Sequence, residues 1–112
     1  MVARWEQGSV ILVDFDPSLG HESKKQQPAL VVSNDQFNER SSLVLVCPIT
    51  SADNGYPLHI SIGSTLTGVS GFACVEQIRT LDLAHRDAIT VGRVSENVVA
   101  AVTHLVALMV KM

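Results

Sequence analysis

The side chains best suited to chemistry gather in the polar stretch that follows the first apolar run. His21 and Glu22 are adjacent there, and Lys24 and Lys25 follow within three residues. A histidine and a carboxylate can transfer protons near neutral pH, and an ammonium group can stabilise a phosphate. These residue types favour general acid–base chemistry on a phosphodiester. The lysines are explained equally well as the solvated tip of a loop.

The spacings of common metal-binding and phosphate-binding motifs are absent from the sequence. It contains no Cys-x-x-Cys, no HExxH and no glycine-rich phosphate loop. His59, His85 and His104 stand alone, so we expect surface or satisfied core histidines rather than ligands. Cys47 and Cys74 lie in apolar, strand-like surroundings, where a free cysteine behaves as a small hydrophobe. No metal or other cofactor is expected.

The composition limits which classes of protein the chain could represent. With 112 residues, 46% of them hydrophobic, it predicts one domain over residues 1–112 with a single core. The net charge of −3 argues against a protein that coats nucleic acid, so any RNA contact must be local. The longest apolar run, residues 98–110, is too short to cross a bilayer, and no secretory signal is evident. We expect a cytoplasmic protein without a membrane partner.

Short apolar runs separated by turn residues predict the elements that position these side chains. Strands are expected over residues 10–13, 29–32, 43–47, 58–62, 71–75, 78–81 and 88–94. Pro48 is expected to end the third strand, and the segment 34–40 before it is expected to form either a short helix capped by Asn34 or a turn. Tight connections favour antiparallel pairing. The fold expected is α+β and mainly β, a small bent sheet or barrel.

A long terminal helix is expected to pack on this sheet. Ser95 is suited to its N-cap, and Val98, Val102, Leu105 and Met109 repeat at helical spacing. The helix is apolar nearly all round, which suits either a symmetric subunit interface or a buried core helix.

Four short sequence motifs follow one another along the chain. They are the segment from Asp16-Pro17 through Glu22 to Pro28, then Pro48-Ile49-Thr50-Ser51, Gly55-Tyr56-Pro57, and residues 76–82. Together with the terminal helix they resemble the MazF/PemK toxin family over essentially the whole chain.

The resemblance implies an SH3-like antiparallel β-barrel with a long C-terminal helix, the CcdB/PemK-like fold, assembled as a homodimer. It also implies the toxin of a type II toxin–antitoxin system, neutralised by an antitoxin of the MazE type. Such toxins cut specific sequences in single-stranded RNA, whether mRNA, tRNA or rRNA. The ribose 2′-hydroxyl attacks phosphorus and leaves 2′,3′-cyclic phosphate and 5′-hydroxyl ends without a metal. The alternative is a non-enzymatic, CcdB-like toxin that binds a protein such as DNA gyrase.

The resemblance also assigns site residues. Glu22 matches the loop glutamate, His21 a PemK-type histidine, Thr50 the strand-end threonine and Glu76 the PemK-type aspartate. Glu22 or Glu76 is the expected base, Thr50 a hydroxyl donor to phosphate, and His21 an acid or stabiliser. The expected RNA contacts are Lys24, Lys25, Ser51 and Arg79. Purely structural roles are a turn cap for Thr50 and an ion pair with Arg79 for Glu76.

Position 27 departs from the family pattern, which has arginine before the proline where this chain has Gln27. A PemK-type arginine is also replaced, by Cys74. An amide offers neutral donors but neither the charge nor the planar fork of a guanidinium. Three interpretations remain: Lys24, Lys25 or Arg79 supplies the charge, the chain binds without cutting, or Gln27 is an inactivating substitution in an otherwise active toxin.

Overall fold

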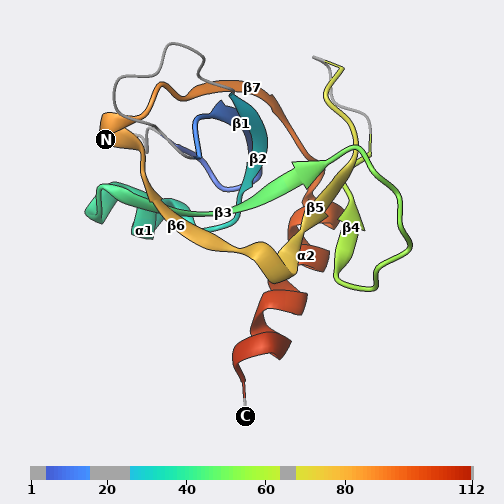
Figure 1. The fold of residues 1–112 in the computed structure, drawn as a ribbon. Helices are drawn as coiled ribbons and strands as arrows, with labels where there is room; N and C mark the ends of the chain where they lie inside the picture. Colours follow the sequence, from blue (N-terminus) through green and yellow to red (C-terminus); the bar gives the residue numbers. More distant parts are fainter. Residues whose placement is uncertain (1–4, 16–25, 64–67, 112) are drawn as a thin grey trace.

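A computed structural model describes residues 5–15, 26–63 and 68–111 of the chain. Its described strands form one bent, antiparallel sheet in the order β4-β5-β3-β2-β1-β7, with β6 also paired to β3 (Figure 1). The strands are β1 (Ser9–Val13), β2 (Gln27–Val31), β3 (Leu43–Thr50), β4 (His59–Ser61), β5 (Phe72–Cys74), β6 (Arg79–Asp82) and β7 (Ile89–Arg93). The helices are α1 (Asp35–Arg40), α2 (Glu96–Val110) and the 3-10 turns η1 (Val75–Gln77) and η2 (Leu83–His85). The expected α+β, mainly β fold is confirmed.

Both expected helix caps are present. The side chain of Asn34 accepts a hydrogen bond from the Phe37 amide at the start of α1, and that of Ser95 accepts one from the Val98 amide at the start of α2. Each satisfies an amide that has no partner inside its helix. The caps fix where the chain leaves the sheet.

Strand β3 is longer than expected, because Pro48 does not end it. Its first half pairs with β6, from Leu43↔Asp82 to Val46↔Arg79, and its last two residues pair with β5. Pro48 lies between these two ladders, so its missing N–H interrupts neither of them. The strand therefore carries Thr50 two residues further, into register with Phe72.

The apolar residues form two clusters, one on each side of the bent sheet. One contains Ile11, Val13 and Leu81; the other contains Val10, Leu30 and Ile49, and receives α2. Val102 is the fully buried residue of α2, with Val98, Val99, Leu105 and Val106 packed around it.

The C-terminal part of α2 extends away from the sheet (Figure 1). Leu108, Met109 and Val110 are 58%, 41% and 75% exposed, so the apolar stripe continues past the core that it covers. No described helix is long and apolar enough to span a membrane.

Candidate active site

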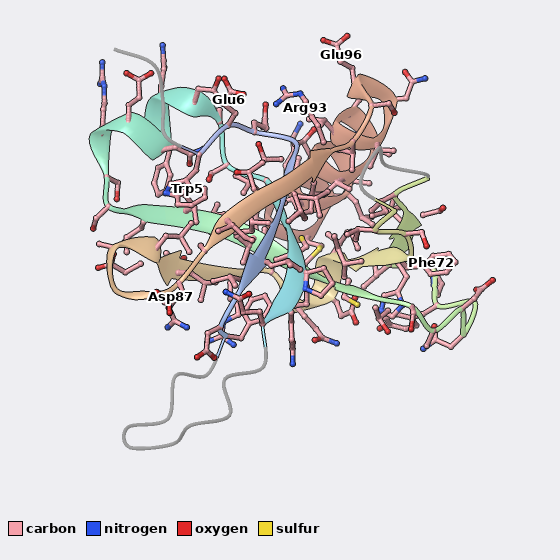
Figure 2. The ribbon with its side chains drawn as sticks, turned by 90° about the horizontal axis from the view of Figure 1, so that it is seen from above. Trp5, Glu6, Phe72, Asp87, Arg93 and Glu96 are labelled. Atoms are coloured by element: carbon pink, nitrogen blue, oxygen red, sulfur yellow. The ribbon has the colours of Figure 1, made fainter. Side chains whose placement is uncertain are left out.

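The end of β3 and the neighbouring strands β5 and β4 place several polar side chains on one face. Thr50 pairs with Phe72, and Cys74, two residues along the same strand, pairs with His59. Because side chains alternate along a strand and cross-strand partners share a face, these four side chains point to the same side. Ala73, between Phe72 and Cys74, points into the core beneath α2. Figure 2 shows Phe72 at the edge of the molecule, far from Asp87.

Gly71 allows this close assembly at the end of β3. It adopts φ +133°, and a Cβ added there would overlap the carbonyl oxygen of Thr50. Only glycine combines this backbone angle with so close an approach of another strand. Gly71 thus sets the position of Thr50 relative to β5.

Gln27 lies at the start of β2, exposed and paired with Val13. The β2–β3 register runs to Ala29↔Pro48. Continued by two residues, it sets Gln27 opposite Thr50 and on the same face. The observed pairing itself ends at Ala29↔Pro48, so a Gln27–Thr50 contact is an expectation from this extended register.

Glu76 does not pair with Arg79, which was its expected structural partner. One carboxylate oxygen lies 2.9 Å from Nε2 of His59, and the same oxygen accepts a hydrogen bond from Gln77. Partial burial raises the pKa of Glu76, but the hydrogen bond from His59, a backbone hydrogen bond and the Gln77 contact outweigh this effect. The net pKa lies below its ordinary value, so the carboxyl is ionised at neutral pH.

His59 is the site residue that the sequence did not reveal. Its side chain is only 9% exposed, and its ring meets that of Tyr56 edge to face at 5.1 Å. Its neighbours Glu76 and Cys74 are 17 and 15 residues away in the sequence, outside the spacings of common metal motifs. The only available signal was that His59 alternates with apolar Leu58 and Ile60 in a short strand.

Thr50 has the hydrogen bond expected of a turn cap. Its Oγ1 accepts from the amide of Ala52 at 3.2 Å, which fixes the side chain at the strand end. The hydroxyl proton is not used by that contact and is available to another acceptor. Ser51, the next residue, is exposed.

Arg79 occupies a different part of the sheet. It begins β6, opposite Val46, and its guanidinium carbon lies 5.5 Å from the centre of the Phe15 ring. The side chain is exposed, so this cation is available to a ligand that approaches past Phe15.

The predicted residues His21, Glu22, Lys24 and Lys25 lie outside the described residues. The residues on either side of that segment form hydrogen bonds with Arg86 and Asp87, which precede β7. The guanidinium of Arg86 donates to the carbonyl oxygens of Asp14 and Phe15 at 2.6 and 2.8 Å, and Gln26 donates to the Asp87 carbonyl at 2.7 Å.

Both cysteines are buried and free, as expected. Burial raises the pKa of the Cys47 thiol to about 12, with smaller contributions from Cys74 and Glu76. Burial also raises the pKa of Cys74, helped by the nearby Glu76 charge and opposed by a hydrogen bond with the Thr50 backbone. Neither thiol is activated as a nucleophile.

The described cavities lie away from this face. One of about 500 Å³ adjoins Trp5, Asn38 and Arg86, and one of about 380 Å³ lies between α1 and α2 beside Phe37 and Val106. Neither of these two cavities is lined by Thr50, His59, Cys74 or Glu76.

Known proteins resemble this chain over nearly its whole length. The family described as PemK-like, MazF-like toxin of type II toxin-antitoxin system matches residues 6–110. The chain belongs to this family. The endoribonuclease toxin ChpB of Escherichia coli (strain K12) is 37% identical over 105 residues, covering 87% of this chain and 86% of that protein. The endoribonuclease toxin MazF of the same strain is 31% identical over 97 residues, covering 85% and 86%. The crystal structure of MazE-MazF (Form-II) from Deinococcus radiodurans has a TM-score of 0.82, 31% identity and 96% coverage of each chain.

Proposed function

We propose that this member of the PemK/MazF-like family is the toxin of a type II toxin–antitoxin pair and cleaves single-stranded RNA. One observation carries the proposal: Thr50 pairs with Phe72 on β5, and the next residue on the same face of that strand, Cys74, pairs with His59, which contacts the Glu76 carboxylate at 2.9 Å. The relatives are named endoribonucleases, which supports the same activity here. The substrates proposed are mRNA, tRNA or rRNA in the cytoplasm.

In the proposed reaction the RNA supplies its own nucleophile. The ribose 2′-oxygen bonds to the adjacent phosphorus while its proton passes to a carboxylate, Glu76 or Glu22. The bond to the 5′-oxygen then breaks, and that oxygen takes up a proton, for which His21 is the proposed donor, leaving a 2′,3′-cyclic phosphate and a 5′-hydroxyl. Because no water molecule must be activated for this step, no metal is required.

The remaining residues would stabilise the crowded phosphorane. The free hydroxyl proton of Thr50 is suited to a phosphate oxygen, and Gln27 opposite it offers two amide protons. The other proposed contacts to RNA or to the transition state are His21, Lys24, Lys25, Ser51 and Arg79. Arg79 is the exposed cation among them that the structure describes.

Partners follow from the same surface and from α2. We infer a homodimer that covers the exposed apolar end of α2, Leu108 to Val110, in a two-fold interface. We also infer a MazE-type antitoxin that competes with RNA, as the similarity to a MazE-MazF complex supports. A concentration-independent monomer in sedimentation, or simultaneous binding of RNA and antitoxin, would contradict these inferences.

A direct assay compares the two classes of toxin. The protein is incubated with end-labelled single-stranded RNA in EDTA, and separately with DNA gyrase in a supercoiling reaction. We expect RNA fragments with cyclic phosphate and 5′-hydroxyl ends, and unchanged supercoiling. Inhibition of gyrase without RNA cleavage, even in a Gln27→Arg variant, would support the CcdB-like alternative, which the similarity to PemK/MazF-like toxins and to a named endoribonuclease does not favour.

A further inference from the structure

Three potential metal ligands meet at the edge of the polar face. His59 and Cys74 are direct cross-strand partners on β4 and β5, and Glu76 follows in η1. One ligand atom from each of these residues, a ring nitrogen, Sγ and a carboxylate oxygen, lies within 4.8 Å of the other two. The histidine and carboxylate are already in hydrogen-bond contact at 2.9 Å.

The same two residues carry unused electron pairs away from water. Among the described residues, Nδ1 of His59 and Oε1 of Glu76 are buried and have no hydrogen-bond partner. Buried polar atoms are nearly always satisfied, so two such atoms on touching side chains need an explanation. The His59 side chain, nine-tenths buried, is held at the cluster by Glu76 on one side and Tyr56 on the other.

The donor types select a metal. Thiolate, imidazole and carboxylate together suit Zn²⁺, which is bound by three protein ligands and an exchangeable water in open sites. Bonds of about 2.0–2.3 Å at tetrahedral angles place ligand atoms about 3.3–3.7 Å apart. In the structure the three ligand atoms lie within 4.8 Å of one another, about 1 Å beyond the separations of a bound zinc site.

The charges also balance in the bound state. Zn²⁺ would meet one carboxylate, one neutral imidazole and one thiolate, which gives the metal and its three ligands a net charge of zero. A cysteine thiol is ordinarily protonated near neutral pH, so the binding step is Zn²⁺ plus thiol giving Zn-thiolate plus one released H⁺.

We propose that His59, Cys74 and Glu76 bind one zinc ion per chain, and that this ion inhibits the RNA-cleaving site. The second half rests on the proposed function, because it assumes that Glu76 acts on RNA. Zinc would occupy the carboxylate that otherwise accepts a proton, and would hold His59 and Glu76 in a fixed coordination geometry beside Thr50.

Binding is tested without RNA, on the full chain. The protein is freed of metal, titrated with Zn²⁺ against a chromophoric chelator, and separately loaded with Co²⁺, whose thiolate charge-transfer absorption reports a sulfur ligand. We expect one ion per chain. Cys74→Ser should abolish the charge-transfer band, and His59→Gln should weaken zinc binding by at least about 10–100-fold, the effect of losing even an outer-shell partner.

Cys47 provides the matched control, because it is the other buried cysteine and belongs to the hydrophobic core cluster but not to the group of three potential ligands. Cys47→Ala should keep both the stoichiometry and the band. X-ray absorption at the zinc edge of the unaltered protein needs no variant and should show a single sulfur at about 2.3 Å. Absence of stoichiometric zinc, a band that survives Cys74→Ser, or zero or two sulfur ligands would overturn the site.

Inhibition is measured as the ratio of cleavage rates with zinc and with EDTA, in the original chain and in Gln27→Arg. At a free zinc concentration ten times Kd, the ratio should fall to about one tenth, the metal-free fraction. In Cys74→Ser the ratio should stay near one. Zinc binding with unchanged cleavage would overturn the inhibition. Absence of cleavage in EDTA from every variant would instead refute the proposed function, while the zinc titration still decides the metal site.

Discussion

Replacing Gln27 with arginine tests the proposed active site most directly. Gln27 is exposed at the start of β2, so the exchange should change the free energy of unfolding by no more than about 0.5 kcal/mol. If the β2–β3 register continues two residues past Ala29↔Pro48, the new guanidinium lies opposite Thr50, where a charge-assisted contact is worth about twice a neutral one. Losing one preorganised donor from an oxyanion-type site costs about 10²–10³ in rate. Gln27→Arg should therefore raise RNA cleavage by about two to three orders of magnitude.

The assay is single-turnover cleavage of labelled single-stranded RNA in EDTA, with host toxicity as a second readout. Gln27→Lys should recover less, because an ammonium lacks the planar fork. The matched control is Gln26→Arg, which adds the same charge one residue earlier, just before β2, where Gln26 donates to the Asp87 carbonyl. Adding Thr50→Ala to Gln27→Arg should remove most of the gain if both residues address one phosphate. The reasoning fails if Gln27→Arg leaves an already active protein unchanged, or if Gln26→Arg gains as much.

Three further substitutions test how the fold holds this site. Gly71→Ala should displace Thr50 and lower the free energy of unfolding by at least about 1–3 kcal/mol. Gly63→Ala, at φ +73° in open space, should cost only the backbone strain of about 1–2 kcal/mol. Urea denaturation measures both. Leu30→Ala, at a position 1% exposed, should cost about 2–5 kcal/mol in the same measurement. Asn38→Ala removes buried hydrogen bonds to the Trp5 and Ser33 carbonyls and should cost about 1–3 kcal/mol; a loss below half a kilocalorie would show that these bonds contribute little.

The features that the sequence predicted depend on local signals. Asn34 and Ser95 are cap residues whose preference acts within one helical turn, and the structure uses both as expected. The strands follow from alternation and apolar runs in the same way. Thr50 came from a family resemblance, and the structure adds the reason for its fixed position: it ends β3 between β2 and β5.

The features that the sequence did not predict depend on pairing between distant segments. His59 and Glu76 are 17 residues apart, and only the register of β4 with β5 brings them together. A one-residue shift of that register would turn His59 to the other face of the sheet. Pro48 is a second example. A proline ends a strand only if a neighbouring strand would accept a hydrogen bond from the N–H that proline lacks, and at Pro48 the neighbour of β3 changes from β6 to β5.

The electrostatics of the site constrain how RNA can be held there. The chain carries a net charge of −3, and the polar face contains an ionised carboxylate at Glu76. The affinity of a protein for single-stranded RNA depends in part on how many of its cations contact phosphates. Arg79, exposed at the start of β6 and stacked on Phe15, is one such cation. Tyr56, 46% exposed next to His59, and the half-buried Phe72 offer surfaces on which bases can stack. If the chain binds RNA as proposed, base contacts must supply a large share of the affinity. Sequence preference and affinity would then come from the same side chains, which is the arrangement that a nuclease acting on short sequences requires.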